Sequence, residues 1–217
     1  MPAKANQNIE AVLFDWDGTL LDSYAADSAA YLGVFRELNI PWGLDELALH
    51  YSPNGHHIYR AAKLPRSSWE AATRAWRKNY DSNRSRLVPG ARRVLAHVAC
   101  RYELGLVTSG DSDRVHRQLR RFQLTRVFAA RVCAEDTTRK KPHAAPLRLA
   151  LRQMDLHPSV CVYVGDSPHD VEMARRAGVR TIAIIGRFPT EKGLRAADPD
   201  VLLDSLLELP DALERLD

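Results

Sequence analysis

Two aspartates stand two residues apart, directly after an apolar run, in the stretch AVLFDWDGTLLDS at residues 11–23. Side chains alternate along an extended chain, so Asp15 and Asp17 are expected to face the same pocket. Neighbouring carboxylates repel each other, and such a pair therefore favours a bound cation or a shared proton. An EF-hand calcium loop is excluded, because its sixth and twelfth positions require Gly and Glu, whereas counting from Asp15 places Leu20 and Ala26 there.

Further groups able to do chemistry follow other apolar runs. Thr108 and Ser109 come after YELGLV, Lys141 lies in RKKP, and Asp166 and Asp170 lie in GDSPHD. Together with the first pair, these residues supply two carboxylate pairs, two neighbouring hydroxyls and a lysine. Those are the groups that phosphoryl transfer through a carboxylate nucleophile needs.

Each group also has a simpler explanation. Thr108 and Ser109 could cap the helix that follows them. Asp170 could be a first-turn residue favoured by the helix dipole, and Lys140 could be the pocket lysine instead of Lys141. The histidines do not add a metal site, because none has metal-ligand spacing backed by other ligands.

The segments that must position these groups alternate between strand and helix after Pro89-Gly90. Strand character occurs at residues 102–108, 160–166 and 180–186, and more weakly at 127–133. A helix is expected from Pro168 to just before Gly178. This alternation predicts an α/β fold with a doubly wound parallel sheet, whose ligand site lies at the carboxyl ends of its strands.

Residues 24–86, before that alternation begins, are expected to be entirely helical. Tyr31, Phe35 and Leu38 have helical spacing, and a second apolar stripe follows at Trp69, Ala72, Trp76 and Tyr80. We interpret this aromatic stripe as the core of a small helical domain rather than as a ligand-stacking surface.

The composition of the 217 residues, 45% hydrophobic and 27% charged, is that of a globular protein with a substantial core. No apolar run is long enough to cross a bilayer, and the polar residues 1–8 do not resemble a signal peptide, so a cytoplasmic protein is expected. Cys100, Cys133 and Cys161 are interpreted as reduced, buried thiols, with no disulfide and no zinc site. The net charge of +4 is spread along the chain and gives only weak support for an acidic partner.

The chemical groups above resemble the four motifs of the haloacid dehalogenase superfamily of phosphohydrolases. The matching segments, in order, are DWDGTLLDS, VTSG, KKP and GDSPHD. The resemblance extends over nearly the whole chain and implies a Rossmann-like core with an inserted helical cap domain. It predicts that residues 1–21 and 88–217 form the core and that residues 22–87 form the cap, which would close over the pocket.

The resemblance also implies catalytic roles. Asp15 would be the nucleophile that forms an aspartyl-phosphate, and Asp17 would be the general acid and then the general base. Thr108, with Ser109, would donate hydrogen bonds to the phosphate, and Lys141 would offset the negative charge that develops there. Lys141 is preferred because, like the family lysine, it precedes a proline.

The metal site implied by the resemblance uses oxygen ligands. Asp15, Asp166 and Asp170 would contribute carboxylates, and Asp17 would contribute its backbone carbonyl. Such a set suits Mg²⁺, a hard cation that takes carboxylate, carbonyl and water oxygens.

Substrate preference can be narrowed in part. An acidic residue at position 17 separates this chain from the dehalogenases and the phosphonoacetaldehyde hydrolases that it resembles. It favours phosphate esters or anhydrides, because an oxygen leaving group needs a proton. In the expected cap, the segment NGHHIYR offers His56, His57 and Arg60 as residues that could contact an anionic substrate.

The expected function is therefore a Mg²⁺-dependent phosphatase for a small phosphorylated metabolite, similar to phosphoglycolate phosphatases. The alternatives are a sugar-phosphate mutase of the β-phosphoglucomutase type and a basic binding module without activity, which intact motifs argue against. We expect a monomer or homodimer with no nucleic-acid partner and no membrane association.

Overall fold

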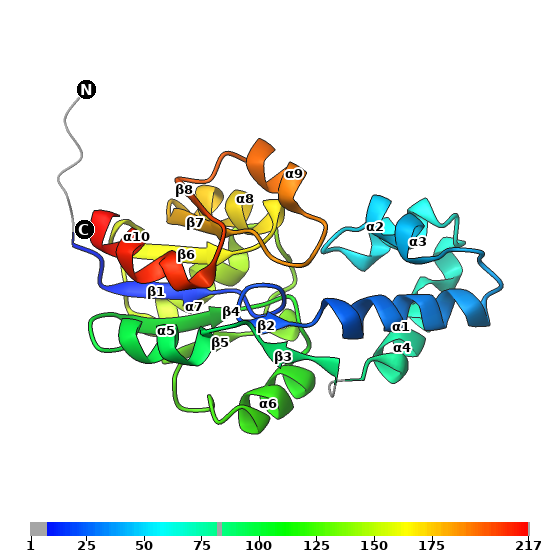
Figure 1. Ribbon diagram of the computed structural model, residues 1–217, viewed down its shortest axis with the longest axis horizontal. Coiled ribbons are helices and arrows are strands. Elements are labelled where there is room, and N and C mark those ends of the chain that lie inside the picture. The colour runs from blue at the N-terminus through cyan, green and yellow to red at the C-terminus, as the bar shows by residue number, and fades with distance from the viewer. Residues whose placement is uncertain (1–7, 82–83, 217) are drawn as a thin grey trace.

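The computed structural model describes residues 8–81 and 84–216. A six-stranded parallel sheet with helices on both faces forms the main body, and a helical segment extends from one end of it (Figure 1). The strand order is β5-β4-β1-β6-β7-β8. The strands are β1 (Ala11–Phe14), β4 (Glu103–Val107), β5 (Ala130–Val132), β6 (Cys161–Gly165), β7 (Arg180–Ile184) and β8 (Val201–Leu203). The doubly wound parallel fold expected from the sequence is confirmed.

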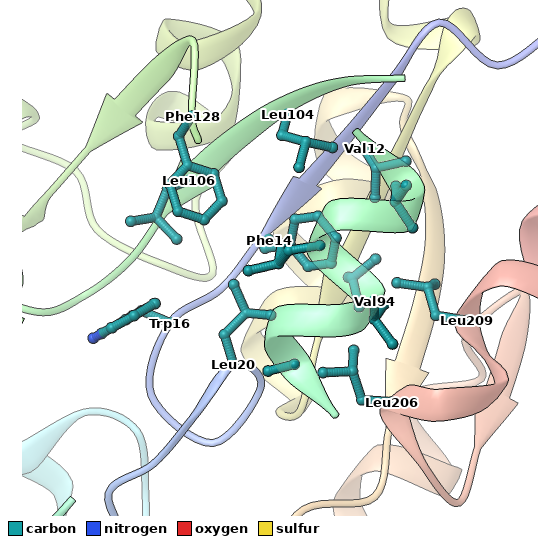
Figure 2. Close-up of a cluster of buried hydrophobic side chains, with 14 of the residues drawn as sticks. Val12, Phe14, Trp16, Leu20, Val94, Leu104, Leu106, Phe128, Leu206 and Leu209 are labelled. Atoms are coloured by element: carbon teal, nitrogen blue, oxygen red, sulfur yellow. The ribbon is translucent and has the colours of Figure 1, made fainter. Parts of the chain in front are cut away.

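Side chains from alternate positions of the central strands pack on opposite faces of the sheet. Val12 and Phe14 of β1 belong to a large cluster on one face, where Figure 2 shows them beside Leu104 and Leu106. Leu13 packs on the other face. Both faces of β1 are therefore buried, which explains its uninterrupted apolar sequence.

The helices of the main body divide between these two faces. The first face is covered by α5 (Ala91–Val98), α6 (Ser112–Arg121) and α10 (Leu209–Leu216). The second is covered by α7 (Ala145–Met154) and α8 (Pro168–Ala177), and α9 (Glu191–Ala196) packs beside α8. Short 3₁₀ turns occur at η3 (Ala134–Asp136), η4 (Pro158–Val160) and η5 (Leu206–Glu208).

Helix α8 has the boundaries that its sequence predicts. Ser167 is the N-cap, Pro168 occupies the first turn, and Gly178 ends the helix with a φ of +79°. Ser167 and Asp170 form a reciprocal capping box, in which each side chain accepts from the backbone N–H of the other. The capping box fixes the direction in which the Asp170 side chain points.

The helical segment has a hydrophobic cluster of its own. It comprises α1 (Tyr24–Glu37), α2 (Leu44–Leu49), α3 (Gly55–Ala61), η1 (Arg66–Ser68) and α4 (Trp69–Asn79). Phe35, Trp69 and Trp76 pack in this cluster, and α4 runs along α1 (Figure 1). Trp69 and Trp76 therefore pack against this core as expected, but Trp76 and Tyr80 also line the cavity described below, so the stripe is not core alone.

The expectation that residues 24–86 are entirely helical is wrong at its end. Helix α4 stops at Asn79, and Tyr80 has an extended ψ of 109°. Strand β3 (Arg86–Leu87) then pairs antiparallel with β2 (Leu21–Asp22). This two-stranded ribbon brings the chain back to the sheet beside the point where it left.

Other expectations have mixed outcomes. The cysteines are free thiols, but Cys100, which follows the C-cap of α5, is exposed, so the expectation that all three are buried is wrong. No helix in the described ranges is both long and apolar enough to cross a membrane. Most of the N-terminal stretch on which the signal-peptide expectation rests lies outside the described residues.

Candidate active site

A cavity of about 390 Å³ lies between the carboxyl ends of the central strands and the helical segment. It is lined by the residues that the sequence singles out for catalysis and metal binding: Asp15, Asp17, Thr108, Ser109, Lys141, Asp166 and Asp170. The topology explains this convergence, because β1, β4 and β6 are parallel neighbours whose carboxyl ends meet at one edge.

Lys141 occupies the centre of the polar groups in this cavity. Its Nζ donates hydrogen bonds to Asp15 Oδ1 (2.7 Å), Asp170 Oδ1 (2.7 Å) and Tyr163 Oη (2.8 Å). These contacts use all three N–H donors of the ammonium group. Although burial disfavours its charge, the adjacent Asp15 and Asp170 raise the pKa of Lys141, so it is held as a cation.

The two carboxylates that Lys141 contacts belong to a cluster of three buried carboxylates. One oxygen from each of Asp15, Asp166 and Asp170 lies within 4.8 Å of the others. Burial, together with the charge of Asp170, raises the pKa of Asp15 to about 7 against the opposing effect of Lys141. Burial and the other two carboxylates raise the pKa of Asp166. The excess of buried negative charge and the all-oxygen donor set fit a hard divalent cation.

The turn after β1 brings the chain into close contact with Asp166. Gly18 has a φ of +85°, and a Cβ added there would lie 2.0 Å from Asp166 Oδ2. A side chain would therefore strain the backbone and displace the carboxylate. The glycine at this position therefore allows the turn to pack against Asp166.

Asp170 has two structural partners besides its place among the carboxylates. Its Oδ1 accepts from Lys141, and its Oδ2 accepts from the Ser167 hydroxyl (2.6 Å) and backbone N–H (3.1 Å). Asp170 is therefore a first-turn residue of α8, as one interpretation of the sequence expected, and its carboxylate also holds Lys141 in place.

Thr108 and Ser109 lie directly after β4. Thr108 is buried, and its Oγ1 accepts from the Gly110 N–H (3.0 Å), whereas Ser109 is exposed. The N-cap of α6 is Asp111, whose carboxylate accepts from the Arg114 N–H. Helix capping therefore does not account for Thr108 and Ser109, which line the cavity.

Asp17 forms an ion pair that the sequence does not indicate. Arg114 of α6 donates to Asp17 Oδ1 at 2.9 Å and to Oδ2 at 2.7 Å. Burial alone would raise the pKa of Asp17, but the charge and hydrogen bonds of Arg114 lower it below its ordinary value. The guanidinium group also lies 4.9 Å from the centre of the Tyr80 ring. Arg114 thereby connects the expected acid–base residue to the end of α4.

Replacing Arg114 by methionine is expected to destabilise the protein by about 2–3 kcal/mol. The substitution leaves the Asp17 carboxylate without its partner, and the side chain of Asp17 is 25% exposed, so the loss falls below the roughly 3–5 kcal/mol typical of fully buried pairs. Urea unfolding at neutral pH measures the change. The double variant Arg114→Met/Asp17→Asn is expected to recover most of the lost stability.

Arg74→Met provides the matched control for this measurement. Arg74 pairs with Glu70 on α4 at 2.8 Å, but both side chains are largely exposed. Loss of such a pair is expected to change stability by less than about 0.5 kcal/mol. Equal effects of the two single variants would contradict a special role for the Asp17–Arg114 pair.

The three residues expected to contact the substrate differ in whether they reach the cavity. His56 lines the cavity and stacks on Trp69, with ring centroids 4.9 Å apart. His57 instead interacts with Ser52 Oγ through Nδ1 (3.3 Å). Arg60 is exposed, with its guanidinium 5.8 Å from the centre of the Trp69 ring. Of these three histidine and arginine candidates, the structure brings His56 to the cavity.

Arg114 and Tyr163 also belong to the site and lacked a usable sequence signal. Arg114 is one of several arginines in the basic helix α6, and Tyr163 stands within the apolar strand β6. Tyr163 is buried, donates to the Val107 carbonyl (2.8 Å) and accepts from Lys141. Tyr163 thus holds the lysine from strand β6 of the sheet.

Comparison with known proteins agrees with this geometry. The family model for haloacid dehalogenase-like hydrolases matches residues 12–184. A phosphoglycolate phosphatase of Salmonella typhi is 27% identical, with 95% of this chain and 93% of that protein covered. The pyrophosphatase PpaX of Oceanobacillus iheyensis is 24% identical, with 93% and 95% covered.

A solved structure gives a corresponding match in three dimensions. A variant of CbbY from Rhodobacter sphaeroides, in complex with xylulose-1,5-bisphosphate, is 27% identical and has a TM-score of 0.79. The match covers 93% of this chain and 96% of that one. The family model matches most of the chain, and the fold and the four motifs at one sheet edge agree with it. The chain therefore belongs to the haloacid dehalogenase-like hydrolase family.

Proposed function

We propose that this protein is a Mg²⁺-dependent phosphatase that hydrolyses a small phosphomonoester through an aspartyl-phosphate on Asp15. The observation that carries the proposal is the buried cluster in which Lys141 contacts Asp15 and Asp170, with Asp166 beside them. Phosphatases among the relatives support the reaction class, and the sugar bisphosphate bound to the CbbY variant supports a small phosphorylated substrate.

In the first step, a carboxylate oxygen of Asp15 attacks phosphorus, and the bond from phosphorus to the leaving oxygen breaks. Asp17 in its protonated form gives its proton to that oxygen, so the alcohol leaves neutral. Because Arg114 favours the ionised form of Asp17, the ion pair must loosen before this proton transfer. Lys141 offsets the charge shared by Asp15 and the phosphoryl group.

In the second step, the Asp17 carboxylate takes a proton from water, and the water oxygen attacks phosphorus. The phosphorus–oxygen bond to Asp15 breaks, which releases inorganic phosphate and restores the carboxylate. Thr108 and Ser109 line the same cavity and would donate hydrogen bonds to the phosphoryl oxygens in both steps.

The metal site that we propose uses the carboxylates of Asp15 and Asp166 and the backbone carbonyl of Asp17. Asp170 lies within the same cluster and also holds Lys141. A bound Mg²⁺ would reduce the repulsion between the anionic nucleophile and the anionic phosphate.

We further propose that residues 22–87 act as a cap over a core formed by residues 1–21 and 88–217. The separate hydrophobic cluster of α1–α4 supports this division, as does the β2–β3 ribbon at its boundary. Residues of both parts line the cavity, so movement of the cap would open and close it.

Removal of the metal is expected to abolish activity. Phosphate release from phosphoglycolate, pyrophosphate, nucleotides, hexose phosphates and acetyl phosphate is measured with Mg²⁺ and then with excess chelator. We expect chelation to reduce release by at least about 100-fold, because loss of the cation restores repulsion at the nucleophile. Restored activity on adding Mg²⁺ is the control for irreversible damage.

Two outcomes of this assay would contradict the proposal. Full activity in chelator would exclude the metal dependence. Isomerisation of a sugar phosphate without release of phosphate would identify a mutase, which uses a phosphoenzyme but keeps water from reacting with it.

A further inference from the structure

A buried glutamine on α6 makes hydrogen bonds that the proposed mechanism does not use. Gln118 is only 1% exposed, and both ends of its side-chain amide are paired. Its Oε1 accepts from Trp16 Nε1 at 2.8 Å and from Arg114 Nη1 at 3.3 Å. Its Nε2 donates to Tyr80 Oη at 3.3 Å. A buried amide needs such partners, and here two of the three come from segments far from α6 in the sequence.

The first partner of this glutamine belongs to the loop that carries the two reactive aspartates. Trp16 stands between Asp15 and Asp17 and is fully buried. Its ring packs in the hydrophobic cluster of Figure 2, where its nitrogen lies at the end of the ring away from Phe14. The hydrogen bond from that nitrogen to Gln118 therefore anchors the glutamine on this loop.

The second partner holds the carboxylate of Asp17. Arg114 precedes Gln118 by one helical turn, so both side chains leave the same face of α6. Its guanidinium group donates to both oxygens of Asp17, at 2.9 and 2.7 Å, and the arginine side chain is only 8% exposed. Its Nε lies 3.6 Å from Asp111 Oδ2, and its Nη1 also donates to Gln118 Oε1. The guanidinium group is therefore restrained along α6 in both directions while it faces the carboxylate.

The third partner covers this arrangement from the helical segment. Tyr80 directly follows α4 and lines the cavity. Its Oη accepts from Gln118 Nε2 and, at 3.4 Å, from Arg114 Nη1. The centre of its ring lies 4.9 Å from the guanidinium carbon. A guanidinium group enclosed by an aromatic ring and an amide keeps one orientation.

We infer that Gln118 is a positioning residue for the proton transfers of Asp17. Anchored on Trp16, it holds the guanidinium group of Arg114 in the orientation that meets both oxygens of the carboxylate. Without this restraint the carboxylate can rotate away from the leaving oxygen, and a small displacement of a reacting group costs much of its rate. The inference rests on the proposed function, in which Asp17 is the acid and then the base.

A purely structural role for Gln118 predicts a different result. If the glutamine served only as the acceptor for the indole N–H, its loss would reduce stability and slow all substrates alike. Positioning of Asp17 instead affects the substrates whose leaving group needs a proton. 2-Phosphoglycolate releases an alkoxide, which needs one, whereas acetyl phosphate releases acetate, which does not. Both leaving groups have two carbons, so the compounds differ in this need more than in size.

The variant Gln118→Met is compared with wild type on these two compounds, with the complete chain and Mg²⁺. The measured quantity is kcat/KM, which covers the steps up to departure of the leaving group. We expect it to fall about 10–100-fold for 2-phosphoglycolate and to stay within about threefold for acetyl phosphate. The fall should lie mainly in kcat, because Gln118 does not line the cavity. Gln153→Met, an exposed glutamine on α7, is the matched control and should leave both values unchanged.

A second background separates positioning from loss of the indole's partner. Trp16→Phe removes the N–H donor, so adding Gln118→Met to it leaves no indole N–H unpaired at this point. Relative to Trp16→Phe alone, we expect the double variant to lose at least about fivefold in kcat/KM for 2-phosphoglycolate, with little change for acetyl phosphate. This comparison tests the inference even if Gln118→Met alone does not fold.

Three results would overturn the inference. They are equal losses on the two compounds, no loss on 2-phosphoglycolate, and no effect of Gln118→Met in the Trp16→Phe background. Faster turnover of 2-phosphoglycolate by Gln118→Met would overturn it as well, because the glutamine would then hold Asp17 away from its task. Hydrolysis of acetyl phosphate by wild type alongside any of these results leaves the proposed function standing.

A stability measurement decides the inference if wild type does not hydrolyse both compounds; hydrolysis of neither would count against the proposed function. Asp17→Asn is introduced with and without Gln118→Met, in wild type or in the Trp16→Phe background, and urea unfolding gives the unfolding equilibrium constants. Arg114 joins the two residues, so their coupling passes through it. We expect the effect of Asp17→Asn on that constant to be at least about threefold smaller when Gln118 is replaced. The same effect in both proteins would overturn the inference.

Discussion

Replacing Asp15 by asparagine is expected to abolish phosphate release while the protein remains folded. The amide cannot serve as the nucleophile toward phosphorus, yet it differs little in volume from the carboxylate. We expect kcat to fall by at least about 10⁴-fold, the scale seen when a covalent nucleophile is removed. The assay follows release of phosphate from acetyl phosphate in the presence of Mg²⁺.

Asp22→Asn is the control from the same segment. Asp22 lies on β2 and pairs with Arg187 (3.2 Å), so the substitution tests the general effect of losing an acidic group near the sheet edge. Its turnover should remain within about threefold of wild type, because loss of a partly exposed pair changes little. Normal turnover by a folded Asp15→Asn protein would exclude Asp15 as the nucleophile.

The metal-free Asp15→Asn protein is also expected to show a different dependence of stability on pH. The pKa of Asp15 rises from 3.8 to about 7 in the fold, so between these values the folded chain binds more protons than the unfolded chain. Wild type therefore loses stability as pH rises through this window, by at most about 1.4 kcal/mol per pH unit from this group. The loss of stability between pH 4 and pH 7, measured by urea unfolding, should be smaller for the variant than for wild type.

The parallel sheet and the edge that holds the candidate active site could be predicted because both leave local signals in the sequence. A strand buried on two faces has a continuous apolar sequence, and the polar residue that ends it stands out. Asp15 and Asp166 follow β1 and β6 in this way, and the strand pairing brings them together. The sequence signals for the short strand β8 and for the end of α4 were weaker.

Contacts between distant elements could not be predicted in the same way. Arg114 pairs with an aspartate 97 positions away, although its helix carries other arginines with the same local setting. Asp27 stands on α1 among small residues, and no spacing marks it as facing a cavity. Whether such residues are paired or unpaired depends on the packing of α1, α4 and α6 against one another, which local periodicity does not describe.

Lys141→Met should lower both activity and stability. The substitution leaves Asp15 and Asp170 without their shared cation, and the three side chains are only 6%, 11% and 3% exposed for Lys141, Asp15 and Asp170. We expect the metal-free protein to lose about 3–5 kcal/mol in the free energy of unfolding, as when one partner of a buried pair is removed. We also expect kcat to fall at least about 100-fold, because the phosphoryl charge is no longer offset.

The neighbouring variant Lys140→Met separates this effect from a general loss of charge. Lys140 is exposed, and its loss should cost about 1 kcal/mol at most for the hydrogen bonds to carbonyl oxygens. Mg²⁺ should restore part of the stability of Lys141→Met, since a bound cation also reduces the repulsion between the carboxylates. Similar stability and turnover for Lys141→Met and wild type would show that the ammonium group does not balance this cluster, and the charge argument for the site would fail.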